Sequence, residues 1–185
     1  MKNKQQLAMN ILILSGSPRI GGNTDRLVEA FANGASKKHH VEVIPVHGYK
    51  VNPCMGCNVC FGNEGNLCCQ NDDMQKIYGK MEQADMLVLA SPVYFYGLSA
   101  QMKAVIDRLH NPIRDTFKIK KTALLLVGAA SLPELFDSII AQYRLCVKFF
   151  KLEDMGHVLV RGVREKGDIV NTTALQEALE LGQKI

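Results

Sequence analysis

The sequence predicts an α/β fold in which helices cover both faces of an open, mostly parallel β-sheet. Short apolar runs alternate with amphipathic stretches along all 185 residues, which is typical of successive strand–helix–strand units. The apolar runs are nearly continuous, as expected of strands that are buried on both faces. No linker, internal repeat or low-complexity tract interrupts the alternation, so residues 1–185 are expected to form a single domain.

Five runs rich in Val, Ile and Leu predict the strands: residues 10–16, 41–46, 86–91, 122–128 and 157–163. Pro45 lies in the second run and favours a position nearer the edge of the sheet, because proline cannot donate a hydrogen bond to a neighbouring strand. Five strands in a chain of this length favour a flavodoxin-like three-layer sandwich over a larger dinucleotide-binding fold. The expected strand order is 2-1-3-4-5.

Apolar residues at helical spacing predict the helices between these strands. Asn23 or Thr24 is expected to cap the first helix, and Asp72 or Asp73 is expected to cap the second. The next two helices are expected to span 98–109 and 135–150, and the last is expected to follow Asn171. Asp107 and Arg108 are interpreted as a surface or structural ion pair at the end of the third helix. From about residue 47 to 71 the chain shows neither the spacing of a helix nor the apolar pattern of a strand, so it is expected to be a loop. A loop of that length in a compact domain is usually functional.

The composition excludes several classes of protein. The net charge of +4 is scattered along the chain, with no basic block, so no nucleic-acid partner is expected. No apolar run approaches the roughly 20 residues that cross a bilayer, and residues 1–16 do not have the pattern of a signal peptide. We therefore expect a cytoplasmic protein without a membrane partner, in which the six cysteines stay reduced.

The segment SGSPRIGGNT, residues 15–24, joins the first predicted strand to the first helix. Its candidate donors to an anion are Ser15, Ser17, Arg19, Asn23 and Thr24. The N-terminus of a helix favours a phosphate, and the glycines allow close approach of the backbone. The segment lacks both the lysine ending of a triphosphate-binding loop and the three-glycine spacing of a dinucleotide site. It therefore favours a monophosphate, with an ordinary glycine-rich turn as the alternative.

The segment SPVYFYGLSAQMKAVIDR, residues 91–108, again runs from a buried strand into a helix. Its candidate contacts to a planar aromatic group are Pro92, Val93, Tyr94, Phe95 and Gly97, which combine a rigid start, aromatic walls and close backbone approach. The alternative is that these aromatic side chains cover the core.

Together with DDM at residues 72–74, these two segments resemble the flavodoxin-like NADPH-dependent FMN reductase family over nearly the whole chain. The resemblance implies an FMN whose phosphate binds at residues 15–24 and whose ring lies against residues 92–97. It also implies NAD(P)H as the electron donor and a homodimer or homotetramer. Relatives often have a glycine-rich loop after the fourth strand, whereas GAASLPEL at residues 128–135 contains one glycine, so contacts from this loop remain open.

The segment CMGCNVC contains Cys54, Cys57 and Cys60, and Cys68 follows after seven residues. Two-residue spacings that let several thiolates converge are typical of iron–sulfur ligation, whereas zinc more often uses two separated knuckles. The pattern resembles the iron–sulfur flavoprotein branch of the same family, which implies a 4Fe-4S cluster on these four cysteines. Cys69 is an alternative fourth ligand, and a redox dithiol, an inert loop, zinc or a disulfide remain open.

The expected function is an FMN-dependent oxidoreductase. It would pass electrons from NAD(P)H through FMN to a flavin, quinone, metal or protein acceptor, with the cluster as a further carrier. Because the flavin performs the chemistry itself, no side chain is predicted to be catalytic. The alternative is a flavodoxin-like electron-transfer protein with little NAD(P)H turnover of its own.

Overall fold

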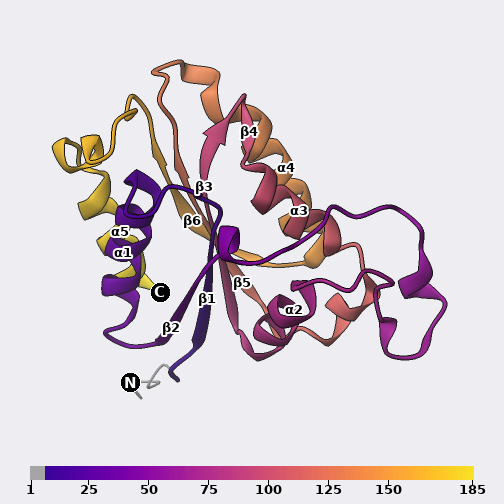
Figure 1. Cartoon of the computed structure of the whole chain (residues 1–185). Coiled ribbons are helices and arrows are strands. Elements are labelled where there is room, and N and C mark those ends of the chain that lie inside the picture. Colours follow the sequence, from indigo (N-terminus) through magenta and orange to yellow (C-terminus); the bar gives the residue numbers. More distant parts are fainter. Residues whose placement is uncertain (1–6) are drawn as a thin grey trace.

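The computed structural model describes residues 7–185 and has a central sheet between two helical layers (Figure 1). The charged residues 1–6, which begin the segment predicted not to be a signal peptide, lie outside the described residues. Five parallel strands follow the order β2-β1-β3-β5-β6, which confirms the flavodoxin-like order predicted from the sequence. The strands are β1 (Asn10–Ser15), β2 (His40–Pro45), β3 (Met86–Tyr94), β5 (Lys121–Val127) and β6 (Glu153–Val160).

The burial of the strands follows from their composition. Every residue of β1 after Asn10 and every residue of β5 after Lys121 is buried, because helices cover both faces of these inner strands. β2 pairs with β1 alone along the described sheet, so Pro45 lies on an edge strand, as predicted.

The third strand is longer than the sequence predicts. β3 continues past Ser91 to Tyr94, because Pro92 stays in register with Val127 of β5. A short strand, β4 (Gly97–Leu98), then turns back and pairs antiparallel with the end of β3. The predicted count of five strands therefore describes the parallel sheet, and β4 adds a hairpin at its carboxyl edge.

The helices form the two outer layers. α1 (Asn23–Ala35) and α5 (Ala174–Lys184) lie on one face, and α2 (Met74–Gln83), α3 (Ala100–Arg108) and α4 (Asp137–Phe150) lie on the other (Figure 1). α1 and α5 pack closely because Gly34 of α1 faces the backbone of α5, and Gly182 of α5 faces the backbone of α1. A Cβ at Gly34 would collide with the carbonyl oxygen of Leu179.

The structure corrects one predicted helix cap and confirms the other. Gly22 is the N-cap residue of α1, while Asn23 and Thr24 are its first two helical residues. Asp73 occupies the N-cap position of α2, but Asp72 accepts the hydrogen bond from the backbone N–H of Met74, at 3.1 Å. Asp72 also has a partner outside the helix, described below.

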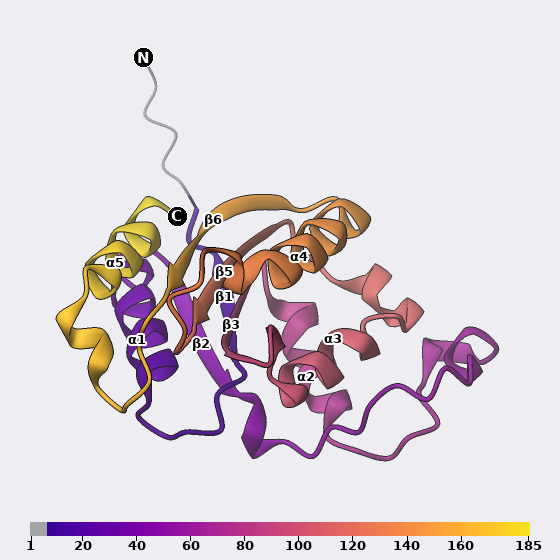
Figure 2. The same ribbon diagram turned by 90° about the horizontal axis from the view of Figure 1, so that it is seen from above.

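The cysteine loop, residues 47–71, contains only single 3-10 turns at Val46–Gly48, Val59–Phe61 and Glu64–Asn66. It extends away from the sheet, beyond α2 and α3 (Figure 2). Across residues 7–185, no helix has the length and apolar character needed to cross a membrane.

Candidate functional site

A pocket of about 200 Å³ lies at the carboxyl ends of the inner strands. Seven of the residues predicted to bind the cofactor line it: Ser17, Arg19, Asn23, Thr24, Pro92, Val93 and Tyr94. The two segments that carry them are about 70 residues apart in sequence, and they meet because β1 and β3 are adjacent and parallel. The fold therefore brings the predicted phosphate segment and the predicted ring segment to one pocket.

The end of the pocket formed by the β1–α1 connection suits an anion. Because the N-cap Gly22 has no side chain, no side-chain hydrogen bond caps the first turn of α1 within the described part of the chain. Free backbone N–H groups at the start of a 13-residue helix are donors for a phosphate. Ser17 and Thr24 are each 3% exposed and add hydroxyl groups to the same wall.

Asp25 organises the turn before α1. Its carboxylate accepts hydrogen bonds from the Gly21 backbone N–H at 2.7 Å and from the Ser15 hydroxyl at 3.3 Å. Gly21 has a φ of 63°, a conformation that glycine adopts without steric cost. Ser15, predicted to bind the phosphate, is 2% exposed and is not among the residues that line this pocket. Its hydroxyl instead supports the turn through Asp25.

Asn23 has a different role from the one expected of a phosphate donor. Its amide nitrogen donates to the Glu165 carbonyl at 2.8 Å, and its amide oxygen accepts from the Gly167 N–H at 2.9 Å. Both polar atoms are therefore hydrogen-bonded to the segment that follows β6. Asn23 lines the pocket and fixes that segment against α1.

Two cations beside Arg19 were missed by the sequence analysis. Arg164 lines the pocket, and its carbonyl oxygen accepts a hydrogen bond from the Arg19 guanidinium at 3.2 Å. Lys166 donates to the Ile20 carbonyl at 3.2 Å. Arg19, Arg164 and Lys166 thus bring positive charge to the neighbourhood of the β1–α1 turn, which favours an anion there. The available signal was the position of Arg164 immediately after the fifth predicted strand, where ligand-binding residues gather.

The other end of the pocket is apolar. Pro92, Val93 and Tyr94 form one wall, while Val127 and Ala129 approach from the end of β5. Ala129 therefore lines the pocket from the glycine-poor loop. Gly128 packs against the core instead, because a Cβ at this position would collide with the Leu135 side chain.

The β3–β4 hairpin has an unusual tip. Phe95 and Tyr96 have φ values of 48° and 63°, and the Phe95 side chain is 98% exposed. Gly97 of β4 pairs with Tyr94 of β3. Phe95 and Gly97, both predicted to contact the ring, lie at this rim and are not among the residues that line the pocket.

The four predicted metal ligands, Cys54, Cys57, Cys60 and Cys68, line one small cavity of about 20 Å³. Four thiols on one cavity fit the donor chemistry of an iron–sulfur cluster. Within residues 7–185, however, no group of three or more His, Cys, Asp or Glu side chains is already arranged to hold a metal ion. Ligation would require these side chains to rearrange.

The fifth cysteine of the loop contacts one of these four. The sulfur atoms of Cys57 and Cys69 are 3.5 Å apart. The backbone N–H of Val59 and the thiol of Cys69 lower the pKa of Cys57, while partial burial raises the pKa of Cys60. The loop therefore contains thiols of unequal acidity, with Cys57 the more readily ionised.

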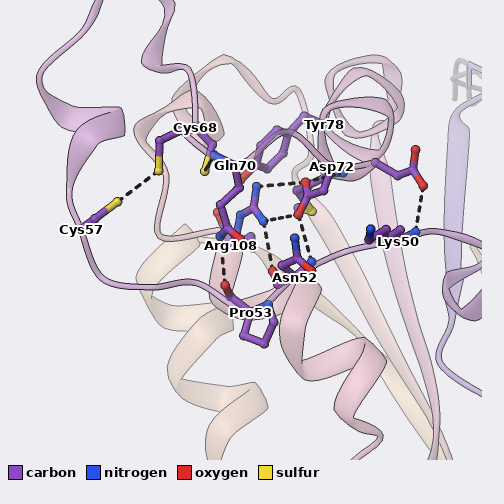
Figure 3. A network of polar contacts seen from close by, with 12 residues as sticks. Lys50, Asn52, Pro53, Cys57, Cys68, Gln70, Asp72, Tyr78 and Arg108 are labelled. Carbon is purple, nitrogen blue, oxygen red and sulfur yellow. Dashed lines mark hydrogen bonds and ion pairs between the residues drawn. The ribbon is translucent and has the colours of Figure 1, made fainter.

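The base of the cysteine loop is fixed by a buried ion pair that the sequence analysis did not predict (Figure 3). Arg108, interpreted as a partner of Asp107, instead pairs with Asp72 at 2.8 Å, and the two side chains are 2% and 0% exposed. Asp107 pairs with Lys103 at 2.6 Å. Burial disfavours the Asp72 carboxylate, but hydrogen bonds from Arg108 and from backbone N–H groups hold its pKa below the ordinary value.

Comparisons with known proteins identify the family. Residues 9–143 match the family described as NADPH-dependent FMN reductase. An iron–sulfur flavoprotein of Methanocaldococcus jannaschii is 41% identical over 125 residues, which cover 66% of this chain and 63% of that protein. An iron–sulfur flavoprotein of Archaeoglobus fulgidus is 31% identical over 185 residues, covering 96% of this chain and 79% of that protein.

The fold also has solved counterparts. The NAD(P)H:quinone oxidoreductase from Methanothermobacter marburgensis superposes with a TM-score of 0.75 over 96% of each chain, at 18% sequence identity. The Trp repressor binding protein from Bacillus subtilis superposes with a TM-score of 0.66 at 25% identity, covering 92% of this chain and 96% of that one.

Proposed function

The chain belongs to the NADPH-dependent FMN reductase family, and we propose that it is an oxidoreductase that takes electrons from NAD(P)H and passes them on through bound FMN. The observation that supports this most directly is the pocket at the carboxyl edge of the sheet. It combines an uncapped helix N-terminus, nearby arginines and an apolar wall in one space of about 200 Å³. A flavin mononucleotide has the matching parts, a phosphate and a planar ring.

The residues divide the binding task between the two ends of the pocket. Ser17, Thr24 and the first N–H groups of α1 would hold the phosphate, with Arg19 and Arg164 supplying positive charge. The wall of Pro92, Val93 and Tyr94 would orient the ring and exclude water from one face. FMN itself supplies the transfer of hydride and electrons, so the protein need only bind and orient it.

Backbone groups of residues 92–97 would stabilise negative charge on the reduced ring, because oriented N–H dipoles in a pocket need no reorganisation during the reaction. No side chain of the pocket is needed as a general acid or base. This is consistent with a lining of hydroxyls, arginines and apolar groups.

We propose further that the cysteine loop holds a 4Fe-4S cluster on Cys54, Cys57, Cys60 and Cys68. Support comes from the shared cavity of these four thiols and from relatives that are themselves named iron–sulfur flavoproteins. The reducing cytoplasm predicted from the sequence would keep the thiols available for iron. With a cluster, the acceptor would be a protein; without it, a flavin, quinone or metal ion. A homodimer or homotetramer is part of the same proposal.

The test is anaerobic purification followed by FMN, iron and sulfide analysis and steady-state NAD(P)H oxidation with quinone, free flavin and ferricyanide. The proposal requires bound FMN and turnover with at least one acceptor. A flavin-loaded protein with negligible turnover would instead be an electron carrier. A protein that binds no FMN would overturn both assignments, and flavin without iron would remove only the cluster.

A further inference from the structure

The two ends of the cysteine loop meet at the side chain of Arg108, next to a pair of hydrogen bonds between Lys50 and Asp73 (Figure 3). Its Nη1 donates to the Asn52 carbonyl at 3.0 Å and to Asp72 Oδ2 at 2.8 Å, and its Nη2 donates to Asp72 Oδ1 at 3.3 Å. Asn52 lies just before the first cysteine of the loop, and Asp72 lies just after the last. One guanidinium therefore joins both ends of the loop.

Further contacts close the same neck. The backbone N–H of Asn52 donates to Asp72 Oδ2 at 2.9 Å, so the two ends also bond to each other directly. The Gln70 amide donates to the Pro53 carbonyl at 3.0 Å, one step further into the loop. The side chain of Arg108 also lines the small cavity that the four cysteines share. The neck and the thiols thus form one continuous structure.

Burial of this pair indicates a role beyond stability. Arg108 and Asp72 are 2% and 0% exposed, and buried ion pairs can often be replaced by apolar residues of similar volume without loss of stability. An apolar pair cannot supply the planar guanidinium fork. This group donates to the two oxygens of a carboxylate and to a backbone carbonyl at the same time. That geometry fixes the relative position of Asn52 and Asp72.

Helix α3 relates this neck to the flavin pocket. Arg108 is its last residue, and the helix, at nine residues, is about 13 Å long. At its other end the Ser99 hydroxyl caps the helix, and the Ser99 N–H donates to the Ser91 hydroxyl of β3 at 3.0 Å. β3 continues into the wall of Pro92, Val93 and Tyr94. One rigid helix therefore separates the loop from the pocket by a fixed length.

We propose that Arg108 is a positioning residue which, by holding Asn52 and Asp72 together, keeps the four cysteines on one cavity and at a fixed place relative to the flavin pocket. The cluster that it would position belongs to the proposed function. The closure of the neck is a property of the metal-free chain and can be tested separately. In this role Arg108 acts through Asn52 and Asp72 and supplies no ligand to the cluster.

The decisive variant is Arg108→Lys, which keeps a buried cation but loses the fork. After reconstitution with ferrous iron and sulfide, iron retained per bound FMN should fall about tenfold, as for other residues that orient metal ligands. In the metal-free protein, chymotrypsin should cleave the loop at the exposed Phe61 and Leu67 about tenfold faster, because local opening governs such cleavage. FMN content should stay unchanged.

Two further proteins separate positioning from general stability. Lys103→Met removes the exposed Lys103–Asp107 pair on the same helix and should leave iron content and cleavage unchanged. The double variant Arg108→Met, Asp72→Met removes both buried charges, so it should fold and bind FMN while the neck stays open. If this double variant regains wild-type iron content and protease resistance, the pair acts through stability alone and the proposal is overturned.

The outcomes also separate this proposal from the cluster. A wild-type protein that binds no iron overturns the cluster assignment, and Arg108 is then judged on the cleavage rates alone. Arg108→Lys with the wild-type cleavage rate overturns the positioning role, whether or not iron is bound.

Discussion

The Arg108 guanidinium lies 2.8 Å from the Asp72 carboxylate, although the two residues are 36 positions apart and both side chains are almost completely buried. Arg108 ends a helix that begins beside the proposed flavin pocket, and Asp72 ends the cysteine loop. The contact therefore links the two parts of the molecule in which redox chemistry is proposed. Its energetics give the first prediction.

Asp72→Asn should lower the free energy of unfolding by about 3–5 kcal/mol, because it leaves a buried guanidinium without its counter-charge. The pKa of Asp72 is held below its ordinary value by Arg108 and by backbone N–H groups, against the effect of burial. The carboxylate therefore stabilises the fold fully above about pH 4, and this contribution is lost as the pH falls through the lowered pKa. Urea unfolding of both proteins between pH 7 and pH 3 should show their difference shrinking at the acid end. A difference that stays constant would contradict the assignment of the charge to this pair.

Arg19→Ala and Arg164→Ala should each weaken FMN binding roughly tenfold, since each would remove an exposed positive charge beside the proposed phosphate site. The measurement is titration of apoprotein with FMN, followed by quenching of flavin fluorescence. Arg26→Ala is the matched control, because Arg26 is an exposed cation of the same helix α1 but is not among the residues that line the pocket. Equal affinity for all three variants would place the phosphate elsewhere.

The parts of this protein that depend on local pattern were predictable from the sequence. β1 and β5 are mostly apolar runs, and such runs are typical of parallel strands that are buried between two helical layers. The β1–α1 and β3–α3 connections could be assigned to one pocket because adjacent parallel strands end at the same edge. The strand order and the meeting of the two segments followed from these rules.

The contacts that sequence analysis missed are those between distant segments. Whether Arg108 pairs with its neighbour Asp107 or with Asp72 depends on how the cysteine loop returns to α3, and no local periodicity encodes that path. Asn23 was expected to face a phosphate, but the segment after β6 supplies a carbonyl and an N–H that match its amide. Short polar side chains can serve either purpose, and only the tertiary structure decides between them.

Cys68→Ala should abolish iron incorporation, whereas Cys69→Ala should leave it nearly intact. Cys68 lines the cavity shared by Cys54, Cys57 and Cys60, while Cys69 contacts Cys57 from outside this lining. Loss of one of four thiolate ligands removes a bond that the cluster needs. Iron and sulfide are measured after anaerobic reconstitution, with Cys146→Ala on α4 as a control that should match the wild type. If Cys69→Ala abolishes iron incorporation and Cys68→Ala leaves it nearly intact, Cys69 is the fourth ligand.

Phe95→Asn should stabilise the metal-free apoprotein by about 0.5–1 kcal/mol and at the same time weaken FMN binding. Phe95 and Tyr96 form the two-residue turn between β3 and β4, and both have positive φ, which asparagine adopts more readily than phenylalanine. The Phe95 side chain is 98% exposed, so its replacement removes almost no packing. A strained, exposed aromatic residue at the rim of the pocket is explained if its ring covers the bound flavin.

Phe149→Asn on α4 is the control for this variant, because Phe149 is also an exposed aromatic residue, at 63%, but is not among the lining of the pocket and has no positive φ. It should leave FMN affinity unchanged and should not raise the melting temperature. Thermal unfolding and FMN titration of the two variants test the prediction together. An increase in stability without loss of FMN affinity for Phe95→Asn would mean that the strain is real but that Phe95 does not contact the flavin. If Phe95→Asn loses both stability and FMN affinity, the aromatic ring supports the hairpin itself. The free energy gained from relief of backbone strain would then be smaller than the free energy lost with the packing of the ring.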